Sequence, residues 1–118
     1  MKRDFLSSME DILESIRKIE SFSANISEEE FYADELRQSA ILRELSVIGE
    51  AVKNIPDATR EKYPSTPWKE IAGFRDVISH AYFEVIMKRV WNVLQEHLPA
   101  LKKDMQEIVK DESKKEEK

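Results

Sequence analysis

The sequence predicts an all-α fold, an antiparallel up-and-down bundle of four main helices with one short extra helix. Three observations lead to this class. Apolar residues recur at steps of three and four along most of the chain, which is the period of an amphipathic helix. The 118 residues include two glycines, four prolines and no cysteine, so few positions interrupt a helix and no disulfide framework is available. No segment alternates in hydrophobicity as a half-buried strand would, and packed helices are then the economical arrangement.

The first half of the chain predicts two long helices. The first covers about residues 3–22, and the second opens at a capping box formed by Ser27 and Glu30. Pro56 ends the second helix, and a connector with three prolines and one helical turn follows. The two apolar stripes consist of Phe5, Met9, Ile12, Ile16 and Ile19 in the first helix and of Ile41, Leu45, Ile48, Val52 and Ile55 in the second.

The second half predicts two more helices and a tail. Thr66 as N-cap with Pro67 at the first helical position starts the third helix, with Trp68 and Phe74 as core or interface anchors. The fourth helix is marked by Phe83, Met87, Val90, Leu94 and Leu98, and Pro99 should kink or break it before Leu101, Met105 and Ile108 continue the apolar face. We expect one helical domain over residues 1–109. The tail 110–118 has no apolar residue and is expected to be frayed or disordered.

The composition of the chain limits the classes of function that the protein can have. The net charge of −5 argues against a simple nucleic-acid-binding protein, so any RNA contact must be local, around Arg75, Lys88 and Arg89. The two histidines, His80 and His97, are too far apart in sequence for a zinc motif, and neither a metal nor another cofactor is expected. No membrane span or signal peptide is recognised, which predicts a cytoplasmic location.

The residues with most chemical capability lie together at 75–82. On a helix that turns about 100° per residue, Asp76 and His80 share one face, while Arg75, Ser79 and Tyr82 gather on a neighbouring face. Arg75 and His80 are then splayed by roughly 140°, so one helix cannot aim both at a single atom. A groove between helices, or between two copies of the chain, could bring them together.

These residue types suit acid–base chemistry on a phosphate. Histidine exchanges protons near neutral pH, and the arginine fork binds phosphate oxygens. Asp76 could orient the imidazole of His80. An Arg/His pair without a carboxylate cluster is what metal-free cleavage of RNA would use, because the ribose 2′-hydroxyl supplies the nucleophile. Glu50 either faces the motif helix, where its carboxylate could pair with Arg75, or lies exposed to solvent.

Several blocks of sequence resemble a known family. They are residues 48–51 (IGEA), 63–64 (YP), 67–76 (PWKEIAGFRD), 80–83 (HAYF), 90–91 (VW) and 98–102 (LPALK). In order and spacing they resemble HepT-like members of the HEPN superfamily, toxins paired with an MntA-like minimal nucleotidyltransferase antitoxin. Two departures are Asp76, where many members have asparagine, and Glu84 and Ile86, where the family often carries Gly and Asp.

The resemblance implies the function and the roles of the residues. It implies a metal-independent endoribonuclease that pairs through its motif helices as a homodimer, with Arg75 and His80 as the catalytic pair. It also implies that the partner enzyme adds AMP to Tyr82, which would block access of RNA. Two alternatives stay open: a non-catalytic substrate-binding or regulatory subunit of a nucleotidyltransferase, in which Arg75 and Tyr82 hold nucleotide phosphate, and a helical dimerisation module.

Overall fold

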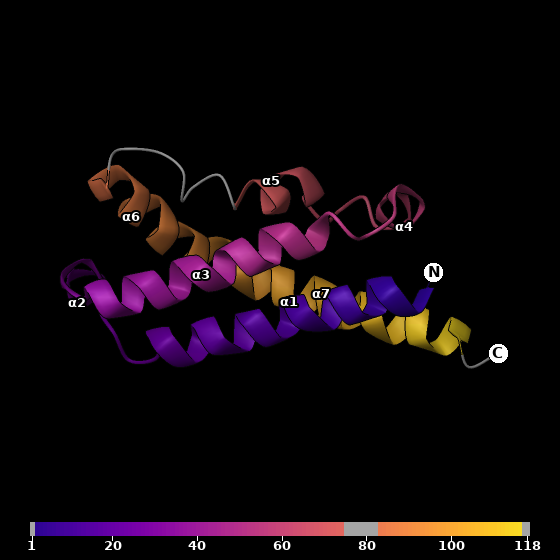
Figure 1. Cartoon of the computed structure of the whole chain (residues 1–118), viewed down its shortest axis with the longest axis horizontal. Helices are drawn as coiled ribbons and strands as arrows, with labels where there is room; N and C mark the ends of the chain where they lie inside the picture. Colours follow the sequence, from indigo (N-terminus) through magenta and orange to yellow (C-terminus); the bar gives the residue numbers. More distant parts are fainter. Residues whose placement is uncertain (1, 75–82, 117–118) are drawn as a thin grey trace.

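The fold is a bundle of helices, in agreement with the predicted all-α class. The computed structural model describes residues 2–74 and 83–116 of the chain (Figure 1). Within these ranges every regular element is a helix. The expected HEPN-like helical bundle is therefore confirmed as the fold class.

The first long helix runs as predicted. Helix α1 (Lys2–Ser23) is followed by the short α2 (Glu28–Ala33) and then by α3 (Glu35–Val52). Figure 1 shows α1 and α3 side by side and running in opposite directions, and the two pack directly on one another. The apolar stripe of α1 is buried, since Met9, Ile12 and Ile16 expose none of their surface. Burial of this stripe against α3 stabilises the helix pair.

Two helices, α2 and α3, take the place of the single second helix that was predicted. The capping box is present, because Ser27 Oγ accepts from the Glu30 N–H (3.1 Å) and Glu30 Oε1 accepts from the Ser27 N–H (2.9 Å). However, the helix it opens ends at Ala33. Asp34 then leaves the helical conformation and caps α3, with Oδ1 accepting from the Arg37 N–H (3.0 Å). A second local cap therefore overrides the continuous helix that was predicted.

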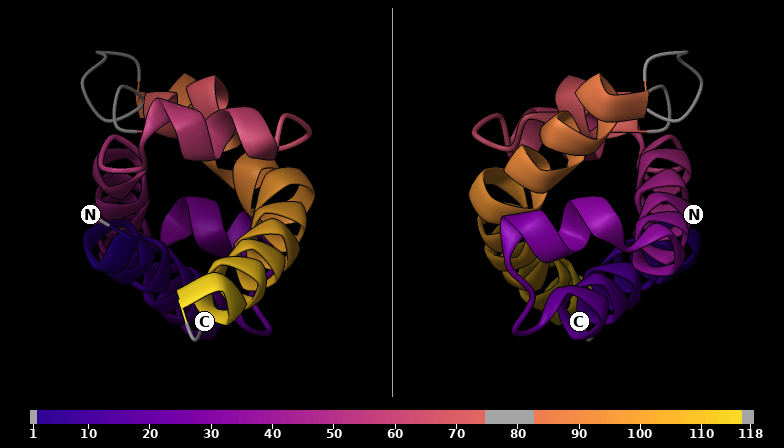
Figure 2. Two further views of the ribbon diagram at one scale, coloured as in Figure 1. Left: turned by 90° about the vertical axis from the view of Figure 1, so that its right-hand side faces the viewer. Right: turned by 90° about the vertical axis from the view of Figure 1, so that its left-hand side faces the viewer.

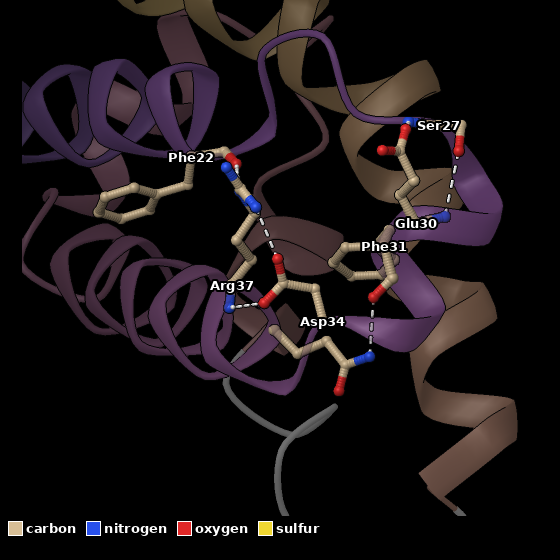
Figure 3. A network of polar contacts seen from close by, with 7 residues as sticks. Phe22, Ser27, Glu30, Phe31, Asp34 and Arg37 are labelled. Atoms are coloured by element: carbon tan, nitrogen blue, oxygen red, sulfur yellow. Dashed lines mark hydrogen bonds and ion pairs between the residues drawn. The ribbon is translucent and has the colours of Figure 1, made fainter.

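Arg37 holds the corner between α1, α2 and α3 (Figure 3). Its guanidinium donates to Asp34 Oδ2 (2.6 Å) and to the Phe22 carbonyl at the end of α1 (2.9 Å). The same side chain thus joins the end of one helix to the N-cap of another. This fixes the angle at which the chain turns back on itself.

Two short helices follow. Helix α4 (Asp57–Lys62) is the helical turn expected within the proline-rich connector, and α5 (Trp68–Ala72) begins where the third helix was predicted. The predicted N-cap is wrong: Pro67 occupies that position without a side-chain cap, and Thr66 Oγ1 donates instead to Asp104 Oδ2 (3.1 Å). Trp68 and Phe74 are both buried, as predicted for anchors.

The last part of the described chain is one continuous helical path. Helix α6 (Phe83–Asn92) passes into a π-helical turn, η2 (Val93–His97), and then into α7 (Leu98–Glu116). Pro99 was predicted to kink or break the helix; the path is not broken, and its α-helical geometry changes just before Pro99. A proline ring collides with the carbonyl four residues earlier in a regular α-helix, here that of Gln95, and the wider π turn lies at this place.

The segment after Lys110 also differs from the expected frayed tail. Helix α7 continues to Glu116, and Glu112 is 1% exposed. Its carboxylate accepts a hydrogen bond from Tyr63 Oη (3.0 Å) and lies 3.7 Å from Lys62 Nζ. A long-range partner therefore keeps this charged stretch helical.

The core lies between the long helices. Seen along the bundle, α3 and α7 lie on opposite sides, with α1 beside both of them (Figure 2). Ile12, Ile41, Ile48 and Met105 are fully buried between these helices. Among the described residues, no helix has both the length and the apolar character needed to cross a membrane.

Candidate functional site

The five motif residues fall outside the part of the chain that the structure describes. They are Arg75, Asp76, Ser79, His80 and Tyr82. The structure does describe both flanks of this motif: α5 leads to Phe74, directly before Arg75, and α6 begins at Phe83, directly after Tyr82. The roles of the five residues remain predictions. The segments on either side of the motif are described, and their contacts show how the chain is held where it enters and leaves the motif.

The chain enters the motif from a buried anchor. Ile71 and Phe74 expose 2% and 7% of their surface. The indole Nε1 of Trp68 donates to the carbonyls of Arg60 (3.2 Å) and Tyr63 (3.1 Å), which holds the ring under the connector. Apolar burial and a satisfied indole N–H therefore fix α5 up to the residue before Arg75.

The connector before α5 is tied to helix α7 at two points. Tyr63 Oη donates to Glu112 Oε2 (3.0 Å) and Thr66 Oγ1 donates to Asp104 Oδ2 (3.1 Å). Burial, together with the hydrogen bond to Glu112 and its charge, raises the pKa of Tyr63 to about 12. Neither contact could be predicted from a local pattern, because the partners lie 49 and 38 positions apart, and Thr66 was predicted to be an N-cap instead.

Helix α4 is tied to the end of α3. The Arg60 guanidinium donates to the carbonyls of Val52 (2.9 Å) and Ile55 (3.0 Å). These bonds hold α4 against the last residue of α3 and the turn that follows it. Glu50 lies nearby on α3, exposed, with Oε2 3.9 Å from Lys53 Nζ. Its predicted pairing with Arg75 involves a residue outside the described ranges and stays a prediction.

A groove of about 660 Å³ lies between α5 and the α6–η2–α7 path. It reaches Phe74, so it adjoins the start of the motif. Its polar lining carries three carboxylates and one guanidinium, together with His97. The lining consists of Pro67, Glu70, Ile71, Gly73, Phe74, Arg89, Asn92, Val93, Glu96, His97, Ala100, Leu101 and Asp104.

The two basic residues expected near RNA are exposed. Lys88 and Arg89 both lie on α6, and Arg89 lines the groove. They are available for contact with phosphate, while the carboxylates of the groove would repel it. No three His, Cys, Asp or Glu side chains come together as metal ligands would within residues 2–74 and 83–116.

The fold and the sequence at 75–82 together define a class of protein. A small helical bundle presents an R-x4-H-x-Y segment between two helices that are packed into its core. The chain matches the ribonuclease HepT-like family over residues 12–108, a range that includes the whole motif. It therefore belongs to this family, and the class of enzyme is an endoribonuclease.

Curated relatives are similar along nearly their whole length. A Methanocaldococcus jannaschii protein named "Putative RNase MJ1216" is 44% identical over 93% of this chain and 91% of its own. The "Probable ribonuclease HepT" of Thermococcus cleftensis is 41% identical over 93% of this chain and all of its own. "Putative RNase TTE0752" of Caldanaerobacter subterraneus is 40% identical over 88% and 93%. No solved structure gives a significant match.

Proposed function

We propose that this protein is the toxin of a HEPN/MNT toxin–antitoxin pair, a type VII-like system. In this proposal it is a metal-independent RNase with Arg75 and His80 as catalytic residues. The observation that carries the proposal is the family match over residues 12–108, which contains R-x4-H-x-Y in one uninterrupted segment. The relatives named as RNases support the nuclease part. In this proposal the protein acts in the cytoplasm.

The proposed reaction is cleavage by the adjacent ribose hydroxyl. A histidine takes the proton of the 2′-hydroxyl, O2′ forms a bond to phosphorus, and the bond from phosphorus to O5′ breaks. A second proton donor protonates O5′, so the products are a 2′,3′-cyclic phosphate and a 5′-hydroxyl. Arg75 stabilises the additional negative charge on the phosphate oxygens in the transition state. Asp76 and Ser79 support the catalytic pair by orienting its side chains.

Two copies of the chain complete the proposed site. Arg75 and His80 are splayed by roughly 140° on an ideal helix, so one motif helix does not direct both at the same phosphate. A homodimer that pairs the motif helices brings two Arg/His sets to one cleft. One histidine then acts as the base and the other as the acid.

Tyr82 is the proposed control point. The MntA-like nucleotidyltransferase transfers AMP from ATP: the phenolic oxygen forms a bond to the α-phosphorus, pyrophosphate leaves, and the phenolic proton passes to a base. AMP at Tyr82, two residues from His80, adds bulk and negative charge. Both effects exclude an RNA phosphate from the cleft.

Expression in cells tests the toxin function. We expect growth arrest and RNA cleavage on induction of the wild-type chain and neither with His80→Ala. Co-expression of the cognate nucleotidyltransferase should restore growth, and Tyr82→Phe should prevent that rescue. Absence of arrest with both chains would contradict the toxin function and favour a substrate-binding subunit of the nucleotidyltransferase.

A further inference from the structure

We propose that Tyr63, Thr66, Asp104 and Glu112 are positioning residues for the ribonuclease site. The two hydrogen bonds that join them, here called the α7 tie, set the place from which the chain enters the catalytic motif. The inference rests on the proposed function for its catalytic consequence. Its structural basis lies wholly within the described residues.

Helix α5 is too short to hold its own position. It has five residues, and its N-cap Pro67 makes no side-chain cap bond. Isolated helices of fewer than about 12 residues are marginal in water. Between α4 and α5 the described backbone hydrogen bonds are only of the turn type, such as Thr66 N–H to Tyr63 O (3.2 Å). The location of α5 therefore depends on side chains.

The α7 tie supplies two separate points of attachment. Asp104 and Glu112 are eight residues apart on α7, which is about 12 Å along a helix axis. The bonds of Arg60 hold the start of the connector to the end of α3, but they do not attach it to α7. Two bonds at this separation fix its direction along α7, and with it the direction in which α5 starts.

Both attachments use charged acceptors: Glu112 is buried, whereas Asp104 is half-buried and accepts its bond from the buried hydroxyl of Thr66. Thr66 is 4% exposed and Glu112 is 1% exposed. A buried carboxylate is costly unless it is hydrogen-bonded and paired, and here Tyr63 and Lys62 provide those partners. An apolar contact would stabilise several nearby positions of the connector equally well. A directional hydrogen bond selects one of them.

The motif lies immediately beyond this support. From Thr66, eight residues lead to Phe74, which is buried, and the next residue is Arg75. A displacement of α5 is thus passed to the first catalytic residue. A misplacement of about 1 Å can lower the rate of an enzyme by roughly 100-fold.

The test variant removes both bonds while keeping the shapes of the side chains. It carries Tyr63→Phe and Thr66→Val, and the matched control is Lys102→Gln, which removes the bond from α7 to Glu20 on α1 (3.1 Å). Glu112→Gln serves as the conservative variant, because its amide oxygen still accepts from Tyr63. Circular dichroism establishes that each variant is folded, and the single Tyr63→Phe and Thr66→Val variants replace the double one if it does not fold.

The imidazole of His80 provides a readout independent of cleavage. The chain has two histidines, so a 1H–13C spectrum contains two Cε1–H signals, and His97→Gln identifies the one from His80. We expect the double variant to shift the His80 signal and to lower kcat on RNA by about tenfold or more, with KM changed less than kcat. The control and Glu112→Gln should resemble wild type.

The results of these experiments either support or contradict the positioning role of the α7 tie. An unchanged His80 signal in the folded double variant, or equal shifts in the control, would overturn it. If wild type does not cleave RNA, the proposed function fails, whereas a His80 shift confined to the double variant still supports the positioning role of the α7 tie.

Discussion

The buried side-chain amide of Gln38, at the corner of α2 and α3, leads to a specific prediction about the stability of the fold. Gln38 is 1% exposed, and its Nε2 donates to the carbonyls of Phe31 (2.8 Å) and Tyr32 (3.0 Å). Figure 3 shows this corner, where Phe31 lies next to the capping box and to the pair of Asp34 and Arg37. The change Gln38→Glu keeps the size of the side chain and replaces its two N–H donors by oxygen.

The expected loss of stability follows from the two carbonyl groups that the introduced carboxylate would face. Two carbonyls lose their donor, at about 1–3 kcal/mol each when buried, and both then face a negative charge. We expect the free energy of unfolding at pH 7 to fall by about 3–5 kcal/mol. This is a large fraction of the about 5–15 kcal/mol that stabilises a typical domain.

The loss of stability in Gln38→Glu should increase with pH. Burial near two carbonyl oxygens raises the pKa of the introduced carboxyl in the folded state, because the neutral form is favoured there and can donate one O–H bond. Its unfolded pKa is about 4.3. The deficit relative to wild type is therefore smallest below about pH 4.3 and grows as the pH rises through the folded pKa.

Urea unfolding between pH 4 and 8 measures this deficit. The matched control is Gln106→Glu, the same change at an exposed position of α7, which should cost little at any pH. A deficit at Gln38 that does not vary with pH, or that equals the control, would refute the argument from the buried donor.

Three further predictions concern local elements. Ser27→Ala removes the side-chain half of the capping box and should lower the free energy of unfolding by about 1 kcal/mol, measured by urea titration against Ser21→Ala at an exposed position of α1. Ultraviolet titration should show one tyrosine, absent in Tyr63→Phe, that ionises near pKa 12; because this folded pKa exceeds the ordinary value of about 10, its contribution to stability is present below pH 10 and is lost as the pH rises toward 12. Truncation after Val109 removes Glu112 and should lower Tm, whereas removal of residues 117–118 should not. An unchanged Tm in the longer truncation would mean that the end of α7 is dispensable.

Local patterns predicted much of the fold. The period of apolar residues located α1 closely, and the spacing of Ser27 and Glu30 identified a real capping box. The break at Asp34 was missed because the capping box marks only where a helix begins. Between Phe31 and Ile41 the positions at helical spacing are polar, Asp34 and Gln38 among them, and the side chain of Asp34 caps a new helix there.

Long-range partners account for the main differences. Thr66 has the residue type of an N-cap, but its hydroxyl bonds to Asp104, 38 positions away. The stretch after Lys110 has the composition of a solvated tail, but Tyr63 accounts for the burial of Glu112 from 49 positions away. Neither partner is visible in a local window. The candidate site shows the same limit: the motif was found from its residue types and family blocks, while the α7 tie required the structure.

The central claim is that His80 cleaves RNA without a metal ion. The direct measurement is incubation of the purified protein with RNA in the presence of EDTA, followed by analysis of the product ends, for wild type beside His80→Ala and His97→Gln. We predict cleavage with 2′,3′-cyclic phosphate and 5′-hydroxyl ends by wild type and His97→Gln, and loss of cleavage in His80→Ala. Cleavage that persists in His80→Ala, or that requires an added divalent ion, would contradict the claim.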